Sequence, residues 1–334
     1  MFLYNFNIAK ANFPFETLTY SSTKELKVGQ ICLIEVRGTT FFGVVKEQSD
    51  LNSNQIKNLL SVVEIYNFYL GPKHLEFLNK VAFLTFNSFN NLFVTLTTPL
   101  SLIKNLGAWD NSKALEDKNG ISPQLEYIIN KDWDSVIEGI IETIIKKNIT
   151  FSKNYNILII YPEKNSLEKG YSNLIANSNF NKKIEVYNTL TASKKKLLPV
   201  LSLLYGLDNL EPEVEPKLKI IFANKNILFA NLAYIDQIVV VDEANPSYIS
   251  ETRIYFDTRE IAFWASLVYS LNLTFVSTVP SVRFYNQNKE QLSKLEVPEL
   301  SIKFLERTGR QSDFENILNE INCGGLIVSD YEDY

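Results

Sequence analysis

The dipeptide Asp242-Glu243 has the residue types and the position to hold a magnesium ion and polarise a water molecule. It follows "IDQIVVV", a β-branched run that predicts a buried strand. In a parallel sheet, ligand groups lie at the carboxyl ends of the strands. An aspartate there can reach magnesium through water, and a following glutamate can orient the attacking water. Acidic residues also end many strands for structural reasons, so the pattern alone leaves both interpretations open.

Three other polar segments follow strand-like runs, and we expect them at the same edge of a sheet. They are Tyr161–Glu163, Ala223–Asn226 and Ser277–Ser281. The combination of four polar strand ends is more specific than any single one. It predicts one polar site at which several loops meet.

The elements that must position these segments alternate between helices and buried strands from Ile121 onward. Strands are expected at 155–163, 217–224, 236–243 and 273–278, and helices at 133–148, 195–207 and 258–271. Continuous apolar strands separated by helices favour a parallel sheet that is covered on both faces. We therefore predict an α/β domain in this part of the chain.

The first hundred residues are predicted to be mainly β-structure. The runs 30–36 and 39–47 flank Arg37-Gly38, a hairpin signal, and 59–70 is compatible with a strand or a helix. A helix start at Gly71-Pro72 and apolar spacing near 3.6 predict one helix over 71–93.

The chain turns polar from Thr97 to about Gly120, and this stretch is the best candidate for a linker. The resulting division is a β-rich domain at 1–105, a linker at 106–120, an α/β lobe at 121–285 and a C-terminal extension at 286–334.

Charge and composition narrow the classes of partner. The net charge is −5, which does not favour nucleic-acid binding by itself. Residues 1–105 carry 9 Lys+Arg against 7 Asp+Glu, a balance of +2, and the remainder carries 24 against 31, or −7. If the protein contacts a polyanion, we therefore expect the contact in the first third of the chain. No apolar run is long enough to span a membrane and no secretion signal is recognisable, so we expect a cytoplasmic protein without a membrane partner.

Metal binding and histidine catalysis are not expected. The chain has two cysteines, Cys32 and Cys323, and a single histidine, His74. Cys32 lies in a strand-like run, where a buried structural thiol is expected. His74 follows a helix start, where we expect an exposed first-turn residue. Zinc would need about four ligands, so we predict no metal and no cofactor.

The four polar strand ends, taken with the flanking residues, resemble the first helicase lobe of the primosomal protein N′ (PriA) family. The matching positions are Phe222–Leu232, Ile238–Tyr248, Arg253–Ala262 and Val276–Ser281. Further segments resemble the 3′ DNA-end-binding domain of the same family: "PFETLTY", "VGQICLIEVRGTTFFGVV" and "IKNLLSVVE". The resemblance covers about 230 residues. It implies an α/β protein with an N-terminal β-rich DNA-end-binding domain, followed by a single RecA-like (P-loop NTPase-type) parallel lobe.

The departures from the family pattern argue against ATP hydrolysis. The family's glycine-rich phosphate loop matches "YIINKDWDSVIEGII", in which Asp134 stands at the lysine position beside Ser135. A carboxylate repels a triphosphate, and the absence of glycine removes the tight turn that wraps it. The chain also ends where the family's second lobe would begin. We therefore expect a degenerate nucleotide site of Asp134, Ser135, Asp242 and Glu243, without catalytic residues.

The N-terminal resemblance implies a pocket for a 3′-terminal nucleotide at Phe15, Glu16, Gly38 and Lys57. An aromatic ring can stack on a base, a carboxylate can accept from the 3′-OH, and a lysine can meet a phosphate. Each residue also has a structural interpretation. Phe15 could belong to the core of an edge strand, Gly38 to a hairpin turn, and Lys57 to a solvated helix start.

Two functional hypotheses follow from the resemblance. The first is a non-catalytic DNA-binding protein of replication restart that recognises forked DNA or a recessed 3′ end. The second is a scaffold that binds primosome or single-strand-binding proteins without contacting DNA. A residual ATPase is a third, weaker hypothesis, and nucleotide-dependent stabilisation would reveal it.

Overall fold

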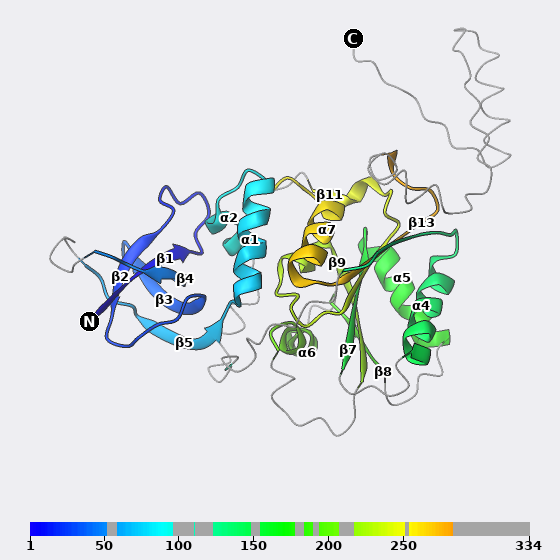
Figure 1. Cartoon of the computed structure of the whole chain (residues 1–334), viewed down its shortest axis with the longest axis horizontal. Helices are drawn as coiled ribbons and strands as arrows, with labels where there is room; N and C mark the ends of the chain where they lie inside the picture. The colour runs from blue at the N-terminus through cyan, green and yellow to red at the C-terminus, as the bar shows by residue number, and fades with distance from the viewer. Residues whose placement is uncertain are drawn as a thin grey trace, which may run out of the picture. The chain divides into compact units, whose positions relative to one another are not determined.

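Two β-sheets, one antiparallel and one parallel, form the frame of the protein (Figure 1). The computed structural model describes residues 1–51, 59–95, 110, 123–147, 154–177, 184–189, 194–206, 217–250 and 254–282. All of them belong to one compact unit, Met1–Asn288, and a second unit, Lys289–Tyr334, lies outside the described residues. The predicted C-terminal extension and most of the predicted linker also lie outside them.

The N-terminal sheet is antiparallel, with strand order β2-β1-β4-β3-β5. Its strands are β1 Phe2–Ile8, β2 Leu18–Ser22, β3 Gln30–Val36, β4 Thr39–Gln48 and β5 Glu64–Tyr69. The predicted hairpin at Arg37-Gly38 is confirmed, and both residues have positive φ (51° and 79°). Two successive positive φ values match the twist of a two-residue hairpin loop. The segment whose type the sequence left open is a strand, β5, and Cys32 is buried as expected.

The second sheet contains six parallel strands in the order β6-β13-β10-β7-β9-β8. They are β6 Leu125–Ile129, β7 Tyr155–Tyr161, β8 Ile184–Asn188, β9 Leu218–Asn224, β10 Gln237–Val241 and β13 Asn272–Ser277. Helices α4 Trp133–Lys147 and α5 Lys164–Asn177 lie on one side of the sheet, and α6 Lys194–Leu204 and α7 Thr258–Tyr269 on the other (Figure 1). The predicted parallel sheet with two covered faces is confirmed.

Short elements join the strands at the carboxyl edge of this sheet. The 3-10 turns η3 Lys225–Phe229 and η4 Pro246–Tyr248 follow β9 and β10, and β11 Ile249–Ser250 pairs with β12 Phe256–Asp257. None of the described helices has the length and apolarity that a membrane span requires.

The single helix predicted over 71–93 is wrong, because the chain forms α1 Pro72–Leu84 and α2 Phe89–Thr95. Phe86 adopts a left-handed conformation (φ 51°), and the N–H of Asn87 reaches back to the carbonyl of Ala82 (2.9 Å). This bond and the weaker one from Phe86 N–H to Phe83 C=O form a Schellman motif, which ends α1. Ser88 then caps α2 through its hydroxyl, which accepts from the N–H of Asn91.

An aromatic seam packs α1 against α7. Phe77 lies against Tyr269 with 5.5 Å between ring centroids, and the Nζ of Lys80 lies 4.0 Å from the ring centroid of Trp264. The expectation that His74 is exposed is wrong. Its side chain is fully buried, and its Nδ1 lies 2.7 Å from the hydroxyl of Tyr269. The first turn of α1 faces α7, and only tertiary packing decides that orientation.

Burial lowers the pKa of His74 from 6.5 to about 3. The imidazole is therefore neutral in the folded chain at neutral pH. In the unfolded chain it regains its ordinary pKa, so protons bind preferentially to the unfolded state between these two values. The free energy of unfolding is therefore highest above pH 6.5, where the histidine is neutral in both states, and it decreases as the pH falls toward 3.

We expect the free energy of unfolding to fall by about 2 kcal/mol between about pH 7.5 and about pH 5, because an unfolded histidine takes up a proton in this window. The chain has one histidine, so the variant His74→Gln should lose most of this dependence. Urea denaturation followed by tryptophan fluorescence measures both proteins. Identical pH dependence in the two proteins would show that His74 is not held neutral.

Candidate functional site

The polar strand ends predicted from the sequence do meet at the carboxyl edge of the parallel sheet. The N–H of Asn130, after β6, donates to the carbonyl of Ser277 at the end of β13 (3.0 Å). The N–H of Glu243, after β10, donates to the carbonyl of Val276 (3.2 Å). The hydroxyl of Ser247 donates to Glu163, after β7 (3.1 Å). The strand order explains these contacts, because β13 lies between β6 and β10, and β7 is the other neighbour of β10.

Glu243 is the centre of this edge, and its carboxylate is buried rather than presented to solvent. The side chain is 0% exposed. One carboxylate oxygen accepts from the hydroxyl of Tyr127 (2.9 Å) and from the N–H of Ser281 (3.0 Å). The other accepts from the hydroxyl of Ser281 and lies 3.6 Å from a guanidinium nitrogen of Arg259. These partners satisfy the buried charge, so the group has a structural role in this conformation.

The charge of Glu243 is balanced by Arg259, which is itself fixed by a second acid. Asp257 caps α7 by accepting from the backbone N–H of Arg259, and its carboxylate also accepts from the guanidinium (2.7 and 2.8 Å). Burial opposes the charged form of Arg259, but the bonds and charge of Asp257 and the charge of Glu243 raise its pKa overall. Burial and the charge of Glu243 likewise raise the pKa of Tyr127. The phenol therefore stays protonated and donates.

Asp242 occupies a strained turn rather than an open coordination position. Its φ is 57°, in the left-handed region that aspartate tolerates better than most residues. Its carboxylate accepts from the side-chain amide of Asn245 (2.8 Å), and its carbonyl accepts from the N–H of the same residue (2.9 Å). Asn245 in turn caps η4. The two acids at the end of β10 thus serve different local structures.

The start of α4, where the resemblance places a phosphate loop, is capped by the chain itself. The carboxylate of Asp132 accepts from the hydroxyl (2.6 Å) and the N–H (3.2 Å) of Ser135. These bonds hold the pKa of Asp132 below its ordinary value. Asp134 accepts from Asn173 on α5 (2.7 Å). No hydrogen bond among the described residues joins Asp134 or Ser135 to Asp242 or Glu243.

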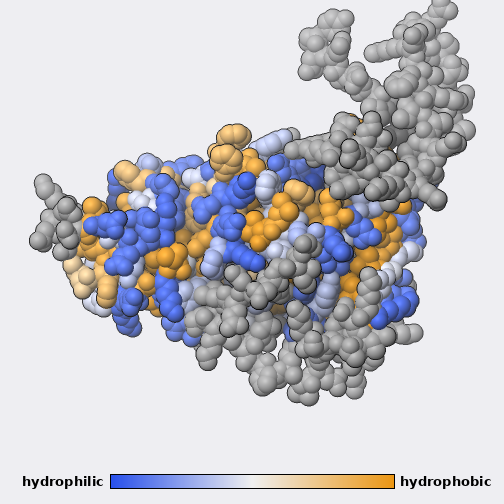
Figure 2. All heavy atoms as spheres, viewed as in Figure 1, coloured by the Kyte–Doolittle hydropathy of each residue, from blue (hydrophilic) through white to orange (hydrophobic). Residues whose placement is uncertain are grey.

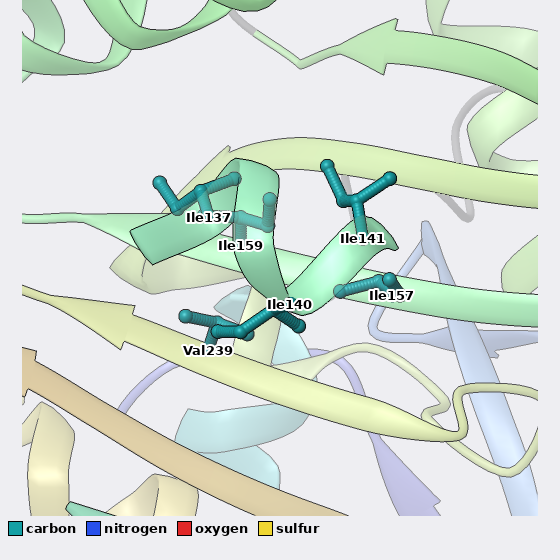
Figure 3. Close-up of a pocket in the computed structure, with 6 residues that line it drawn as sticks. All are labelled: Ile137, Ile140, Ile141, Ile157, Ile159 and Val239. Carbon is teal, nitrogen blue, oxygen red and sulfur yellow. The ribbon is translucent and has the colours of Figure 1, made fainter. Parts of the chain in front are cut away.

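Below this edge, the space between α4 and the sheet is narrow and lined by apolar side chains. Figure 3 shows the six residues that line it, from α4, β7 and β10: Ile137, Ile140, Ile141, Ile157, Ile159 and Val239. They leave no room for a water molecule. Among the described residues, no group of three histidine, cysteine or acidic side chains could hold a metal ion.

A second candidate site lies in the loop between β1 and β2, residues 9–17. Asn90 of α2 fixes this loop, because its amide donates to the carbonyls of Phe15 and Glu16 (3.1 Å each). The amide oxygen of Asn90 accepts from the N–H of Ile8 (2.9 Å), and Asn7 donates to the carbonyl of Glu16 (3.1 Å). Asn90 is buried, so the loop rests on a satisfied internal amide.

Phe15 is 57% exposed, so its interpretation as a core residue is wrong. The segment around it is a loop and not an edge strand. Its ring meets the edge of Phe13 at 5.8 Å. The Nζ of Lys10 lies 5.5 Å from the ring centroid of Phe13 and 5.1 Å from that of Phe41. The loop therefore combines exposed aromatic surface with a nearby positive charge.

Glu16 and Gly38 lie at the same end of the N-terminal sheet as Phe15. Glu16 pairs with Lys46 of β4 (2.6 Å), and their side chains are 75% and 40% exposed. Gly38 sits in the hairpin turn, and the space that a Cβ would fill there is empty. The glycine is required by its φ of 79° and not by a close neighbour. Lys57, the fourth predicted residue, lies outside the described residues.

Several residues that shape these sites were not recognised in the sequence. They are Lys10, Lys46, Asn90, Tyr127 and Arg259. Only Asn90 carried a local signal, because it follows Ser88 at the start of α2. Tyr127 and Lys46 act through partners far away in the chain, whereas Lys10 and Arg259 also contact near neighbours, Phe13 and Asp257, whose pairing the sequence did not reveal.

Comparisons with known proteins do not assign the chain to a family. No model of a protein family matches it, and no curated protein matches it. The two sites are therefore interpreted from their own chemistry.

The variant Glu243→Ala should lower the free energy of unfolding by about 3 kcal/mol, since it leaves the partly buried Arg259 without one of its two acids and the buried Tyr127 hydroxyl without its acceptor. Asp242→Asn keeps a residue that tolerates a left-handed φ and should cost about 1 kcal/mol or less. Urea denaturation compares the two variants with the native chain. Equal stability of both variants would contradict a structural role for the buried carboxylate.

Proposed function

We propose that this protein is a non-catalytic DNA-binding protein of replication restart that recognises forked DNA or a recessed 3′ end. The observation that carries the proposal is Phe15, an exposed aromatic ring on a loop that Asn90 holds in place. A ring of this kind offers a stacking surface for a nucleobase, whatever its sequence. Because the loop is already ordered by internal bonds, little conformational entropy is lost on binding.

The charged groups around Phe15 suit a nucleotide end. Glu16 provides a carboxylate that can accept from a 3′-OH, and Lys46 holds it through an ion pair. Lys10 places a positive charge over the rings of Phe13 and Phe41, where it can contact a phosphate. The hairpin turn at Gly38 lies at the same end of the sheet. These features support the end-binding pocket that the resemblance implies.

The parallel domain supports the same family interpretation without catalysis. We take it to be a RecA-like lobe, in which β13 lies between β6, the strand before α4, and β10, the strand before Asp242. The start of α4 is already capped by Asp132, and Glu243 is already saturated by protein partners. Both features oppose binding of a magnesium nucleotide. We therefore propose that the lobe does not hydrolyse ATP.

A scaffold for primosome or single-strand-binding proteins is the second candidate. It is favoured by Phe263 and Leu267, which are exposed one turn apart on α7. Apolar side chains exposed side by side often mark a protein-binding surface. In this case the lobe, rather than the N-terminal sheet, would carry the function.

We expect the protein to bind a fork with a free 3′-OH more tightly than the same fork with a 3′-phosphate, because Glu16 repels the phosphate. Phe15→Ala should weaken binding to the 3′-OH fork by roughly 5- to 150-fold, the effect of losing one stacked base. Phe263→Ala removes an exposed phenylalanine from α7 and is the matched control. Fluorescence anisotropy measures all three proteins.

The DNA-binding proposal fails if the native chain binds neither fork, or if Phe15→Ala and Phe263→Ala have equal affinity. Loss of partner binding only in Phe263→Ala would favour the scaffold.

Magnesium ATP should leave the thermal midpoint of the native chain unchanged, because the capped start of α4 and the buried Glu243 offer no open phosphate or metal position. A ligand present at about 100 times its Kd would stabilise the chain by about 2.7 kcal/mol. Thermal denaturation with and without the nucleotide measures this difference. A clear upward shift, lost in Asp132→Ala or Glu243→Gln, would instead support a residual ATPase site.

A further inference from the structure

Phe86, at the end of α1, combines two unfavourable features that no other described residue shows together. It is 98% exposed, although its side chain is large and apolar. It also has a φ of 51°, in the left-handed position that ends a helix and that glycine ordinarily occupies. Neither feature improves the fold, since a glycine would end α1 with less strain. A residue that is strained and apolar at the surface suggests a binding role.

A second exposed phenylalanine precedes it on α1. Phe83, three residues earlier on α1, is 75% exposed, and its carbonyl accepts from the N–H of Phe86. In Figure 2, apolar residues protrude from the surface at the upper edge of the view, above α1. Phe83 and Phe86 together are called the α1 platform below.

The α1 platform is structurally continuous with loop 9–17. The turn after Phe86 leads directly into α2, whose Asn90 holds the carbonyl of Phe15. Asn91 of α2 accepts from the N–H of Asn12 in the same loop (2.8 Å). The first turn of α2 therefore fixes loop 9–17 and follows the α1 platform directly in the chain. A strand bound at Phe15 has a second apolar surface at the other end of this short connection.

The charge of this region favours a polyanion. No aspartate or glutamate occurs from Phe77 to Thr95, which covers most of α1 and all of α2, or before Glu16, although the whole chain has a net charge of −5. The one acid of loop 9–17, Glu16, is paired with Lys46. An apolar protein partner requires no such absence of acids, whereas a phosphate backbone is repelled by carboxylates.

We infer that the α1 platform is a second stacking site, which binds bases of the single strand that leads away from the end held at Phe15. This inference rests on the proposed function. The ligand is single-stranded nucleic acid several nucleotides long, and its bases stack on Phe83 and Phe86 without sequence preference. Loop 9–17 then selects the end, and the α1 platform supplies affinity for the strand.

The test compares fluorescein-labelled oligothymidylates of about 4 and about 16 nucleotides with a free 3′-OH, the range of stretches that one single-strand-binding fold covers. Moderately high salt suppresses the phosphate contribution that also grows with length. The native full-length chain should bind the longer strand more tightly. Phe86→Gly should reduce the increase in affinity from the short to the long strand roughly 5- to 150-fold, and should leave the affinity for the short strand unchanged.

The glycine variant separates binding from folding, because the two effects have opposite signs. Glycine relieves the left-handed strain, so the thermal midpoint of Phe86→Gly should be no lower than that of the native chain. Phe83→Ala should weaken binding of the longer strand in the same way. Tyr255→Ala, which removes an exposed aromatic residue of the parallel-sheet part, is the matched control and should change neither affinity.

The outcomes distinguish this inference from the function on which it rests. If the native chain binds neither strand, both fail. Suppose that Phe15→Ala lowers the affinity for both strands, but Phe86→Gly still binds the longer strand more tightly by the full native factor. The α1 platform is then not a nucleic-acid site. In that case a protein-binding role remains for it, and the end-binding proposal stands.

Discussion

The buried carboxylate of Glu243 imposes the constraint on which the arrangement of the parallel domain depends. A charge that is removed from water must be paired and hydrogen-bonded, or the fold loses several kcal/mol (about 3–5). Glu243 meets this requirement with Tyr127 of β6, Ser281 after β13 and Arg259 of α7. Three elements are thereby fixed at one edge of the sheet. The same contacts give the acid after β10 a structural role in this conformation.

From α7, the support extends to the exposed end of the N-terminal sheet. Arg259 lies in the first turn of α7, and Tyr269 at its other end contacts the buried His74 of α1. The end of α1 leads into α2, whose Asn90 holds loop 9–17. Rigid support of this kind lets aromatic residues stay exposed without collapsing onto the core. The proposed binding surface therefore depends on packing that lies far from it in the sequence.

The sequence predicted the central strands because β7, β9 and β10 are buried on both faces and read as continuous apolar runs. It did not predict β6 or β8, because these strands form the two edges of the sheet and are only partly buried. The break at Phe86 was missed because apolar spacing continues across it, whereas the break is made by backbone hydrogen bonds. The burial of His74 depends on a partner 195 residues away. The acids at the end of β10 were recognised, but their partners were not, because spacing along the chain does not reveal them.

Hydrogen–deuterium exchange of the full chain, with and without forked DNA that carries a recessed 3′-OH, tests the central claim most directly. It reports where DNA binds without altering any side chain. The account predicts slower exchange in loop 9–17 and across the turn from Phe86 to Asn91, and no change at 130–135 or 242–247, with or without magnesium ATP. Protection confined to the carboxyl edge of the parallel sheet would contradict it, and would place the binding site at the acids that are interpreted as structural.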